Sequence, residues 1–441
     1  HEFAAIVGGD DPGVRAAIAP VLGGSPAEFA SRVMPKIGAQ RNPVARAQLV
    51  LGMLRSGKER VREGVRAHCE LGDHLAHRLG MTAGVRDGLQ SAFEQWNGQG
   101  LPNGSSGERI PLSARIVFLA RDVEILHRLG GTEHALDAVR RRRGAAYDPL
   151  VANAFSDAGG EILSSLETIS PWDEVLQREP GRHLRIAEGQ LDQVLEAFAD
   201  FVDLKSPFTA GHSRGVARLA EQAAPHDALT LRRAALVHDL GRVSVSNGIW
   251  DKPARLTEGE WERVRLHPYY SERILGRVGT LSSLATLAGM HHERLDGSGY
   301  QRGSTRAEIP TTARVLAAAD AYQAMTQPRA YRPALSSAHA AAELESMARA
   351  GRLDAQAVSD VLSAAGHAPR PGRSVWPAGL SEREVEVLRM ICRGGTKKQV
   401  ATRLSISPST VDHHVRHIYD KAGVQTRAGA TLFAIEHDLL S

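Results

Sequence analysis

Histidine and aspartate residues recur between residues 205 and 335 in an order that could bind metal ions. The set consists of His212, the dipeptide His238-Asp239, His267, the pair His291-His292, and Asp320. Imidazole and carboxylate groups together suit Fe, Mn or Zn, and a carboxylate bridging two cations is typical of two-metal hydrolases. A lone His-Asp dipeptide on a helix is more often a structural pair, so it is the whole set that indicates a metal site.

The neighbours of these residues form specific motifs. They read Val-His238-Asp-Leu-Gly-Arg-Val, Lys252-Pro-Ala-Arg-Leu-Thr257, Leu-His267-Pro and His291-His-Glu-Arg-Leu-Asp-Gly-Ser-Gly-Tyr300. This stretch resembles the HD-GYP branch of the HD phosphohydrolase superfamily. The resemblance implies a helical fold, two or three metal ions, and a substrate such as cyclic di-GMP. It also implies seven metal ligands, with Asp239 as the bridging residue: His212, His238, Asp239, His267, His291, His292 and Asp320.

Basic residues near this set are candidates for binding substrate phosphates. By the resemblance, Arg242 acts with Asp239 in catalysis and stands where the family usually has Lys, which replaces a point charge by a planar fork. Arg329 and Arg332 match family positions near the phosphates, although arginines at a helix end on the surface are an alternative interpretation.

Several positions depart from the family pattern. Phe208 stands where members with three metal ions carry Glu, so we expect two divalent cations, Fe or Mn in the first place and Zn as an alternative. Gln301 replaces the Pro of the Gly-Tyr-Pro motif, and Gln323 replaces an Asp that follows a strand-like segment. The departures leave two functions open, a metal-dependent cyclic di-GMP phosphodiesterase and an inactive ligand sensor.

Part of this module occurs twice in the chain. Residues 93–104 match residues 292–303 at an offset of 199, but Ala92 and Phe93 stand at the positions of the paired histidines. Arg121 stands at the position of Asp320, and its positive charge would repel a cation. The first copy is therefore predicted to be degenerate and to serve packing, dimerisation or ligand sensing.

The last 60 or so residues have a different pattern, three amphipathic helices with short turns. Ser381 and Glu384 can form a capping box, and Thr396 can cap the next helix. The third helix would bury Val411, Val415 and Ile418 and leave its other face free, as in a helix-turn-helix.

This spacing closely resembles the LuxR/FixJ effector domain, which binds double-stranded DNA. The resemblance places nine residues at the DNA: Lys397, Lys398, Ser409, Thr410, Asp412, His413, Arg416, Lys421 and Arg427. From residue 380 onward nine basic residues face seven acidic ones, so the affinity of one domain should be modest, and we expect a homodimer on paired half-sites.

Composition fits a folded helical protein. Apolar residues make up 42% and charged residues 24%, with no apolar run of membrane-helix length and no secretory leader, so we expect a cytoplasmic protein without membrane contact. Two cysteines, Cys69 and Cys392, argue against a disulfide framework. The predicted fold is all-α, with a degenerate HD-GYP copy, an HD-GYP domain and a four-helix LuxR-type domain. The predicted boundaries are 4–175, 183–367, a linker at 368–377, and 378–441.

The combined prediction is a DNA-binding transcriptional regulator whose HD-GYP domain hydrolyses cyclic di-GMP or a related phosphodiester.

Overall fold

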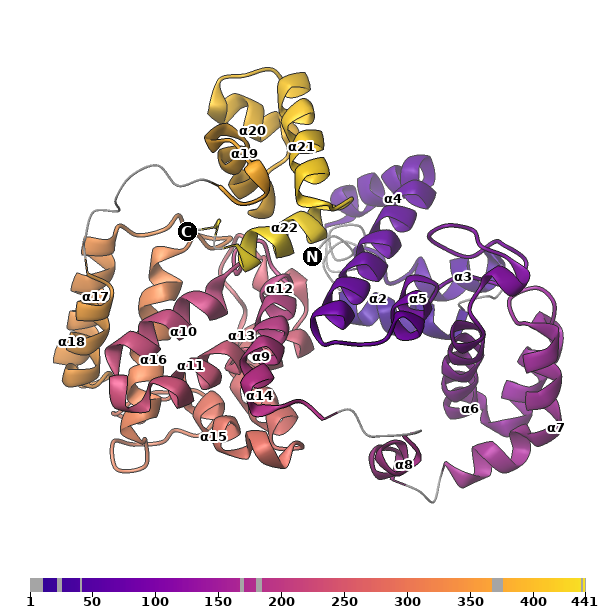
Figure 1. The fold of residues 1–441 in the computed structure, drawn as a ribbon, viewed down its shortest axis with the longest axis horizontal. Coiled ribbons are helices and arrows are strands. Elements are labelled where there is room, and N and C mark those ends of the chain that lie inside the picture. The colour runs from indigo at the N-terminus through magenta and orange to yellow at the C-terminus, as the bar shows by residue number, and fades with distance from the viewer. Residues whose placement is uncertain are drawn as a thin grey trace. The chain divides into compact units, whose positions relative to one another are not determined.

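The computed structural model of the 441-residue chain describes residues 11–21, 26–39, 42–166, 170–179, 185–366, 376–437 and 439–440. Throughout these ranges the secondary structure is helical, with isolated β-bridges in place of any sheet, which confirms the all-α prediction (Figure 1). The chain divides into two compact units, residues 2–191 and 192–441, with the division inside α9.

The first unit contains the degenerate copy. Its helices are α2 (Asp11–Ile18), α3 (Pro26–Val33), α4 (Pro43–Arg78), α5 (Ala83–Gln90), α6 (Leu112–Arg142), α7 (Pro149–Ser165) and α8 (Pro171–Arg178). Phe118, Leu126 and Tyr147 belong to its buried core. Helix α8 crosses the predicted boundary at residue 175, and its apolar residues Trp172, Val175 and Leu176 recur at helical spacing.

The candidate metal ligands lie in the second unit, either within a helix or just after its end. Ten α-helices run between residues 188 and 364, the first of which spans the division between the units. They are α9 (Glu188–Asp203), α10 (His212–Ala223), α11 (Ala228–Val237), α12 (Asn247–Trp250), α13 (Glu258–Arg265), α14 (His267–Leu275), α15 (Ser282–Met290), α16 (Thr311–Thr326), α17 (Ser337–Arg349) and α18 (Ala355–Ala364). Asp320 lies in the middle of α16, so the strand-like interpretation of the segment before it was wrong. Residues 317–319 are all Ala, the strongest helix former, which favours the helix.

A buried glutamate braces the same loop in each repeat. In the second copy Glu293 accepts hydrogen bonds from the backbone N–H groups of Arg302 (3.2 Å) and Ser304 (2.9 Å). In the first copy Glu94 accepts one from Asn103 at 2.8 Å. Each loop also has a glycine pressed against the glutamate's backbone: a Cβ on Gly299 would lie 2.6 Å from the Cα of Glu293. The repeat seen in the sequence is thus a repeat of loop structure.

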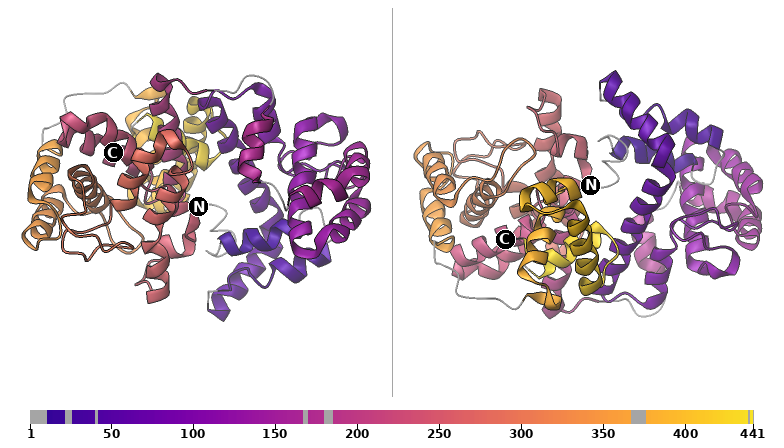
Figure 2. Two further views of the ribbon diagram at one scale, coloured as in Figure 1. Left: turned by 90° about the horizontal axis from the view of Figure 1, so that it is seen from below. Right: turned by 90° about the horizontal axis from the view of Figure 1, so that it is seen from above.

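The C-terminal domain is a bundle of four helices, as predicted. They are α19 (Glu382–Cys392), α20 (Lys397–Leu404), α21 (Pro408–Ala422) and α22 (Arg427–Glu436). Ser381 with Glu384, and Thr396 with Gln399, form capping boxes. Val411, Val415 and Ile418 of α21 are buried, whereas Ser409, His413 and Arg416 of the same helix are exposed. The four helices of this domain are drawn in gold to yellow in Figure 2. Most of the predicted linker at 368–377 lies outside the described residues.

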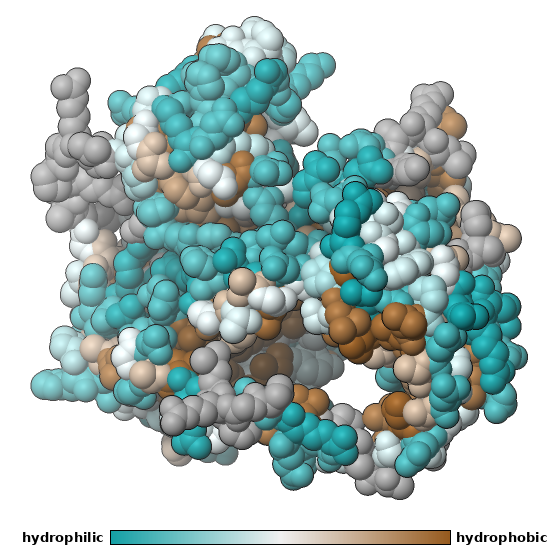
Figure 3. Space-filling model, turned by 45° about the vertical axis from the view of Figure 1, so that its right-hand side comes forward, coloured by the Kyte–Doolittle hydropathy of each residue, from teal (hydrophilic) through white to brown (hydrophobic). Residues whose placement is uncertain are grey.

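Many large apolar side chains are buried, others such as Val175 and Tyr331 are exposed, and the face in Figure 3 is largely hydrophilic with a few apolar patches. Cys69 and Cys392 are buried free thiols. None of the described helices is long and apolar enough to cross a lipid bilayer.

Candidate metal centre

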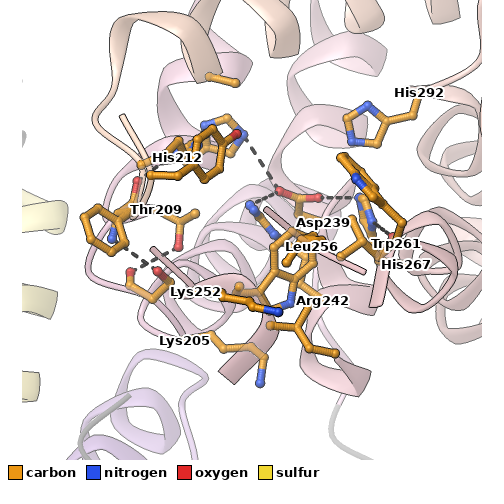
Figure 4. A pocket seen from close by; sticks show the side chains of 18 of the residues that line it. Lys205, Thr209, His212, Asp239, Arg242, Lys252, Leu256, Trp261, His267 and His292 are labelled. Carbon is orange, nitrogen blue, oxygen red and sulfur yellow. Dashed lines mark hydrogen bonds and ion pairs between the residues drawn. The ribbon is translucent and has the colours of Figure 1, made fainter. Parts of the chain in front are cut away.

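The carboxylate of Asp239 lies between two groups of potential ligands (Figure 4). Its Oδ2 atom is 3.8 Å from His212 Nε2 and 3.3 Å from His238 Nε2. Its Oδ1 atom is 3.2 Å from His267 Nε2 and 3.6 Å from His291 Nε2. One oxygen therefore faces each pair of histidines, which is the geometry of a carboxylate that bridges two cations.

Asp320 and His292 complete the two groups. Asp320 Oδ1 lies 3.1 Å from His212 Nε2, and Asp320 Oδ2 lies 3.6 Å from His292 Nδ1. The seven residues that the sequence indicated as ligands are thus all brought together. Their potential ligand atoms fall into overlapping clusters, each of which could hold a metal ion.

Helix ends aim three of the imidazoles. The Nδ1 atoms of His238, His267 and His291 each lie 2.6 Å from the backbone carbonyl oxygen three residues earlier, of Ala235, Val264 and Ala288 respectively. An Nδ1–H that donates to a carbonyl leaves Nε2 with a lone pair, which is the usual way that proteins orient a histidine toward a metal. These bonds form because the acceptor carbonyls lie in the last turns of α11, α13 and α15, shortly before the three histidines.

The donor set fits a cation. His238 Nε2 and His292 Nδ1 are buried without a hydrogen-bond partner, and the Nε2 atoms of His267 and His291 are only 3.2 Å apart. Burial lowers the pKa of His291 to about 4, so its ring is neutral near pH 7 and can act as a ligand. Burial alone would raise the pKa of Asp320, but its contacts with the imidazoles of His212 and His238 outweigh burial and hold this pKa well below its usual value.

One residue of the site was missed from the sequence. Gln327, just after the C-terminal end of α16, has its Oε1 atom 2.9 Å from His212 Nδ1 and accepts a hydrogen bond from the N–H there. It orients His212 as the carbonyl oxygens orient the other histidines. Its only signal in the sequence is its position seven residues after Asp320.

A cavity of about 840 Å³ opens beside Asp239, His212, His267, His292 and Asp320. Basic side chains on its wall outnumber the two acidic ones, Asp239 and Asp320, and five aromatic side chains also line it. The basic residues are Lys205, Arg242, Lys252, Arg255 and Arg329; the aromatic ones are Phe208, Trp250, Trp261, Tyr300 and Tyr331. The volume falls within the range of about 300–1,000 Å³ that small-molecule sites occupy.

The three arginines expected at the phosphates lie in different surroundings. Arg242 donates from Nη1 to Asp239 Oδ2 at 2.6 Å, and Arg329 donates to the backbone oxygen of Phe208 at 2.6 Å. Both line the cavity. Arg332 does not line it, and its guanidinium donates to the carbonyl oxygens of Ala324, Met325, Gln327 and Pro333. The geometry thus gives Arg332 the helix-end role that was the alternative interpretation.

In the first copy an arginine occupies the corresponding position. Arg121 stacks on Phe118, with its guanidinium 4.6 Å from the ring centroid, and pairs with Asp122 at 3.0 Å. His68 and Phe93 pack edge to face nearby, with ring centroids 5.6 Å apart. The cation and the phenyl rings replace the ligand atoms of the second copy, as the sequence indicated.

The DNA-facing candidates divide into two kinds. Lys397 and Arg416 both pair with Asp412 on the exposed side of α21, and Ser409 and Thr410 share hydrogen bonds with Ser407. His413 and Lys398 are also exposed.

Two other candidates hold the domain together. Lys421 Nζ lies 2.7 Å from Glu384, and Arg427 donates to the backbone oxygen of Gly395 at 2.8 Å. Their positions account for a structural role, whereas the remaining candidates lie at the exposed surface or near its edge.

Comparison with known proteins gives two family matches in this chain. Residues 196–357 match the HD domain, and residues 378–434 match the luxR family of bacterial regulatory proteins. A 3'3'-cGAMP-specific phosphodiesterase 3 of Vibrio cholerae is 36% identical over 69% of this chain and 68% of its own length. The 3'3'-cGAMP-specific phosphodiesterase 1 of the same organism is 30% identical over 68% and 74%.

A solved structure is similar as well. The crystal structure of the cyclic GMP-AMP-specific phosphodiesterase V-cGAP3 of V. cholerae aligns with a TM-score of 0.53 at 29% identity, over 80% of this chain and 86% of that one. The chain therefore belongs to the HD-domain phosphodiesterase family of the HD-GYP type and also carries a luxR-type domain.

Proposed function

We propose that this protein hydrolyses a 3'3'-cyclic dinucleotide at a dinuclear metal centre formed by its seven His and Asp ligands. The observation that carries the proposal is the position of Asp239, whose two oxygens face two separate groups of imidazoles beside a basic cavity. A cyclic dinucleotide carries two phosphate charges and two bases, and the cavity offers basic and aromatic side chains for both.

The residues of the chain divide the work as follows. Asp239, Asp320 and the histidines would hold two divalent cations, which would supply an activated water molecule and offset charge on the phosphoryl oxygens. Arg242 and Arg329 bind the non-bridging phosphate oxygens and orient the phosphorus for in-line attack. The imidazole Nδ1–H groups stay on their carbonyl acceptors, so the ligands do not need to reorganise during the reaction.

The test is incubation of Mn- or Fe-loaded protein with 3'3'-cGAMP and, separately, with cyclic di-GMP, with the linear product followed by chromatography. Product from either nucleotide that disappears in Asp239→Ala supports the proposal. Absence of product, with two metal equivalents bound, would contradict hydrolysis and favour the ligand sensor.

A second function, DNA-binding regulation by a homodimer, is favoured by the luxR-type domain. Within residues 192–441 a further cavity is lined by residues 328–334 and by side chains of α19 and α20. Phe208, Arg329 and Tyr331 line both this cavity and the metal cavity. This shared wall supports coupling between a ligand at the metal centre and the DNA-binding domain.

We propose that residues 4–175, 183–367 and 378–441 are the three domains of this regulator.

The coupling is tested by measuring the affinity for DNA duplexes, selected from random sequences, with and without 3'3'-cGAMP. Identical affinity in both conditions would contradict the coupling, because a ligand shifts an equilibrium only by its different affinity for the two states.

A further inference from the structure

Arg242 is held between an acid and an indole ring. Its Nη1 atom donates to Asp239 Oδ2 at 2.6 Å, and its guanidinium carbon lies 4.2 Å from the centroid of the Trp250 ring. Both Arg242 and Trp250 line the metal cavity. A cation within about 6 Å of an indole face is attracted by the ring quadrupole, and Trp is the strongest partner of this kind.

Trp250 itself is held firmly. It ends the short helix α12 and packs against a buried cluster that contains Val245, Ile249 and Val264. Its ring also meets His267 edge to face, with centroids 5.5 Å apart. The stack therefore rests on a fixed ring, and it fixes the plane of the guanidinium next to the bridging carboxylate.

The indole N–H shows that packing alone does not explain this residue. Trp250 Nε1 is buried and has no hydrogen-bond partner among the described residues. A buried donor without a partner is unfavourable, and a phenyl ring would fill the same position without it. A group kept in an unfavourable state beside a site is expected where the group serves function.

We propose that Trp250 is a positioning residue for the substrate: its ring orients the guanidinium of Arg242 toward a non-bridging phosphate oxygen of the bound nucleotide. This inference rests on the proposed function, because the phosphate belongs to the cyclic dinucleotide. A guanidinium directs its two parallel N–H donors at one phosphate only if its plane is held in the right orientation, whereas an ammonium group needs no such orientation. The ring and the arginine thus act as one unit.

The experiment is a double-mutant cycle on binding. The Kd for 3'3'-cGAMP is measured by titration calorimetry on full-length protein treated with EDTA, so that hydrolysis does not enter. We expect Trp250→Leu to raise Kd about 3- to 30-fold in the wild-type background but less than about two-fold in Arg242→Lys. Trp250→Phe keeps an aromatic face but a weaker partner for the cation, so its Kd should lie between those of wild type and Trp250→Leu.

Trp261→Leu is the matched control, because Trp261 also lines the cavity but does not stack on Arg242. Its effect on Kd should be the same with Arg or Lys at position 242. Thermal melting confirms that each variant is folded, and Trp250→Phe should melt no lower than wild type. Equal effects of Trp250→Leu in both backgrounds, or no effect in either, would overturn the inference.

The inference and the proposed function can fail separately. If the protein binds 3'3'-cGAMP with the expected coupling but releases no product when metal-loaded, only hydrolysis is wrong. If the wild type binds no cyclic dinucleotide, the proposed substrate is wrong, and the same cycle is measured with inorganic pyrophosphate. Absence of coupling there would overturn the role of Trp250.

Discussion

The Nε2 atoms of His267 and His291 lie 3.2 Å apart, although both rings have their Nδ1 atoms against backbone carbonyl oxygens. Two imidazoles anchored in this way turn lone pairs toward each other, and their repulsion is relieved when a cation lies between them. The arrangement of these two rings in the folded chain therefore favours binding of a metal ion.

Metal binding should accordingly stabilise the second unit. We expect Mn²⁺ at about 100 times its Kd to add roughly 2.7 kcal/mol of stability for each occupied site, and EDTA to reverse the gain. In calorimetry, His267→Ala should lose most of this response, while His339→Ala, an exposed change on α17, should keep it. An equal response in both variants would contradict the site.

Removal of the side chain that accepts a hydrogen bond from His212 should weaken metal binding, although no proposed metal ligand is changed. Gln327→Leu takes away the Oε1 atom that lies 2.9 Å from His212 Nδ1, so we expect metal affinity to fall about 10- to 100-fold. Gln327→Glu retains an acceptor and should retain most of the affinity. Competition with a chromophoric chelator measures both, and unchanged affinity in the Leu variant would show that the contact is dispensable.

Substitution of Arg329 should affect substrate binding, whereas substitution of Arg332 in the same loop should affect stability. Arg329→Ala should raise KM for the cyclic dinucleotide about ten-fold or more, because the side chain lines the cavity. Arg332→Ala should instead lower the melting temperature, since it leaves carbonyl oxygens at the end of α16 without their donor. The prediction is wrong if Arg332→Ala changes KM and leaves the melting temperature unaltered.

The C-terminal domain should lose stability in acid because the ion pair between Glu384 and Lys421 is lost. Burial alone would raise the pKa of Glu384, but hydrogen bonds from Lys421 and Ser381 outweigh it and lower this pKa to about 2. A carboxylate with a depressed pKa contributes stability that is fully present above its unfolded pKa of about 4.5 and is lost as the pH falls toward 2. The protection factors of α19 and α21 amides in the full chain, which correct for the slower intrinsic exchange in acid, should fall across this window, and Glu384→Gln should remove the dependence.

Asp412 should restrain DNA binding, because it pairs with both Lys397 and Arg416 at the exposed face of α21. We expect Asp412→Ala to free these cations, to raise affinity for a non-specific duplex several-fold at low salt, and to steepen the salt dependence by about one to two phosphate contacts. Lys398→Ala should act in the opposite direction. Fluorescence anisotropy at several salt concentrations tests both, and an unchanged slope in Asp412→Ala would refute the restraint.

The grouping of the seven candidate ligands could be predicted from the sequence because their order and their motif neighbours are specific. Gln327 could not, since a lone glutamine after a helix carries no signal until the fold brings α10 and α16 together. Arg332 and Lys421 show the converse: both match functional positions, yet the fold places carbonyl oxygens and Glu384 next to them. Where a long cationic side chain ends depends on tertiary partners far along the chain.

The loop braced by Glu293 is ordered by the chain's own hydrogen bonds, and the first copy keeps the same brace with Glu94 although its ligand positions have changed. In this module the loop conformation can therefore be retained although the residues at the ligand positions have changed. A duplicated copy can lose its ligands by drift and still fold, which leaves it available for selection toward a new task.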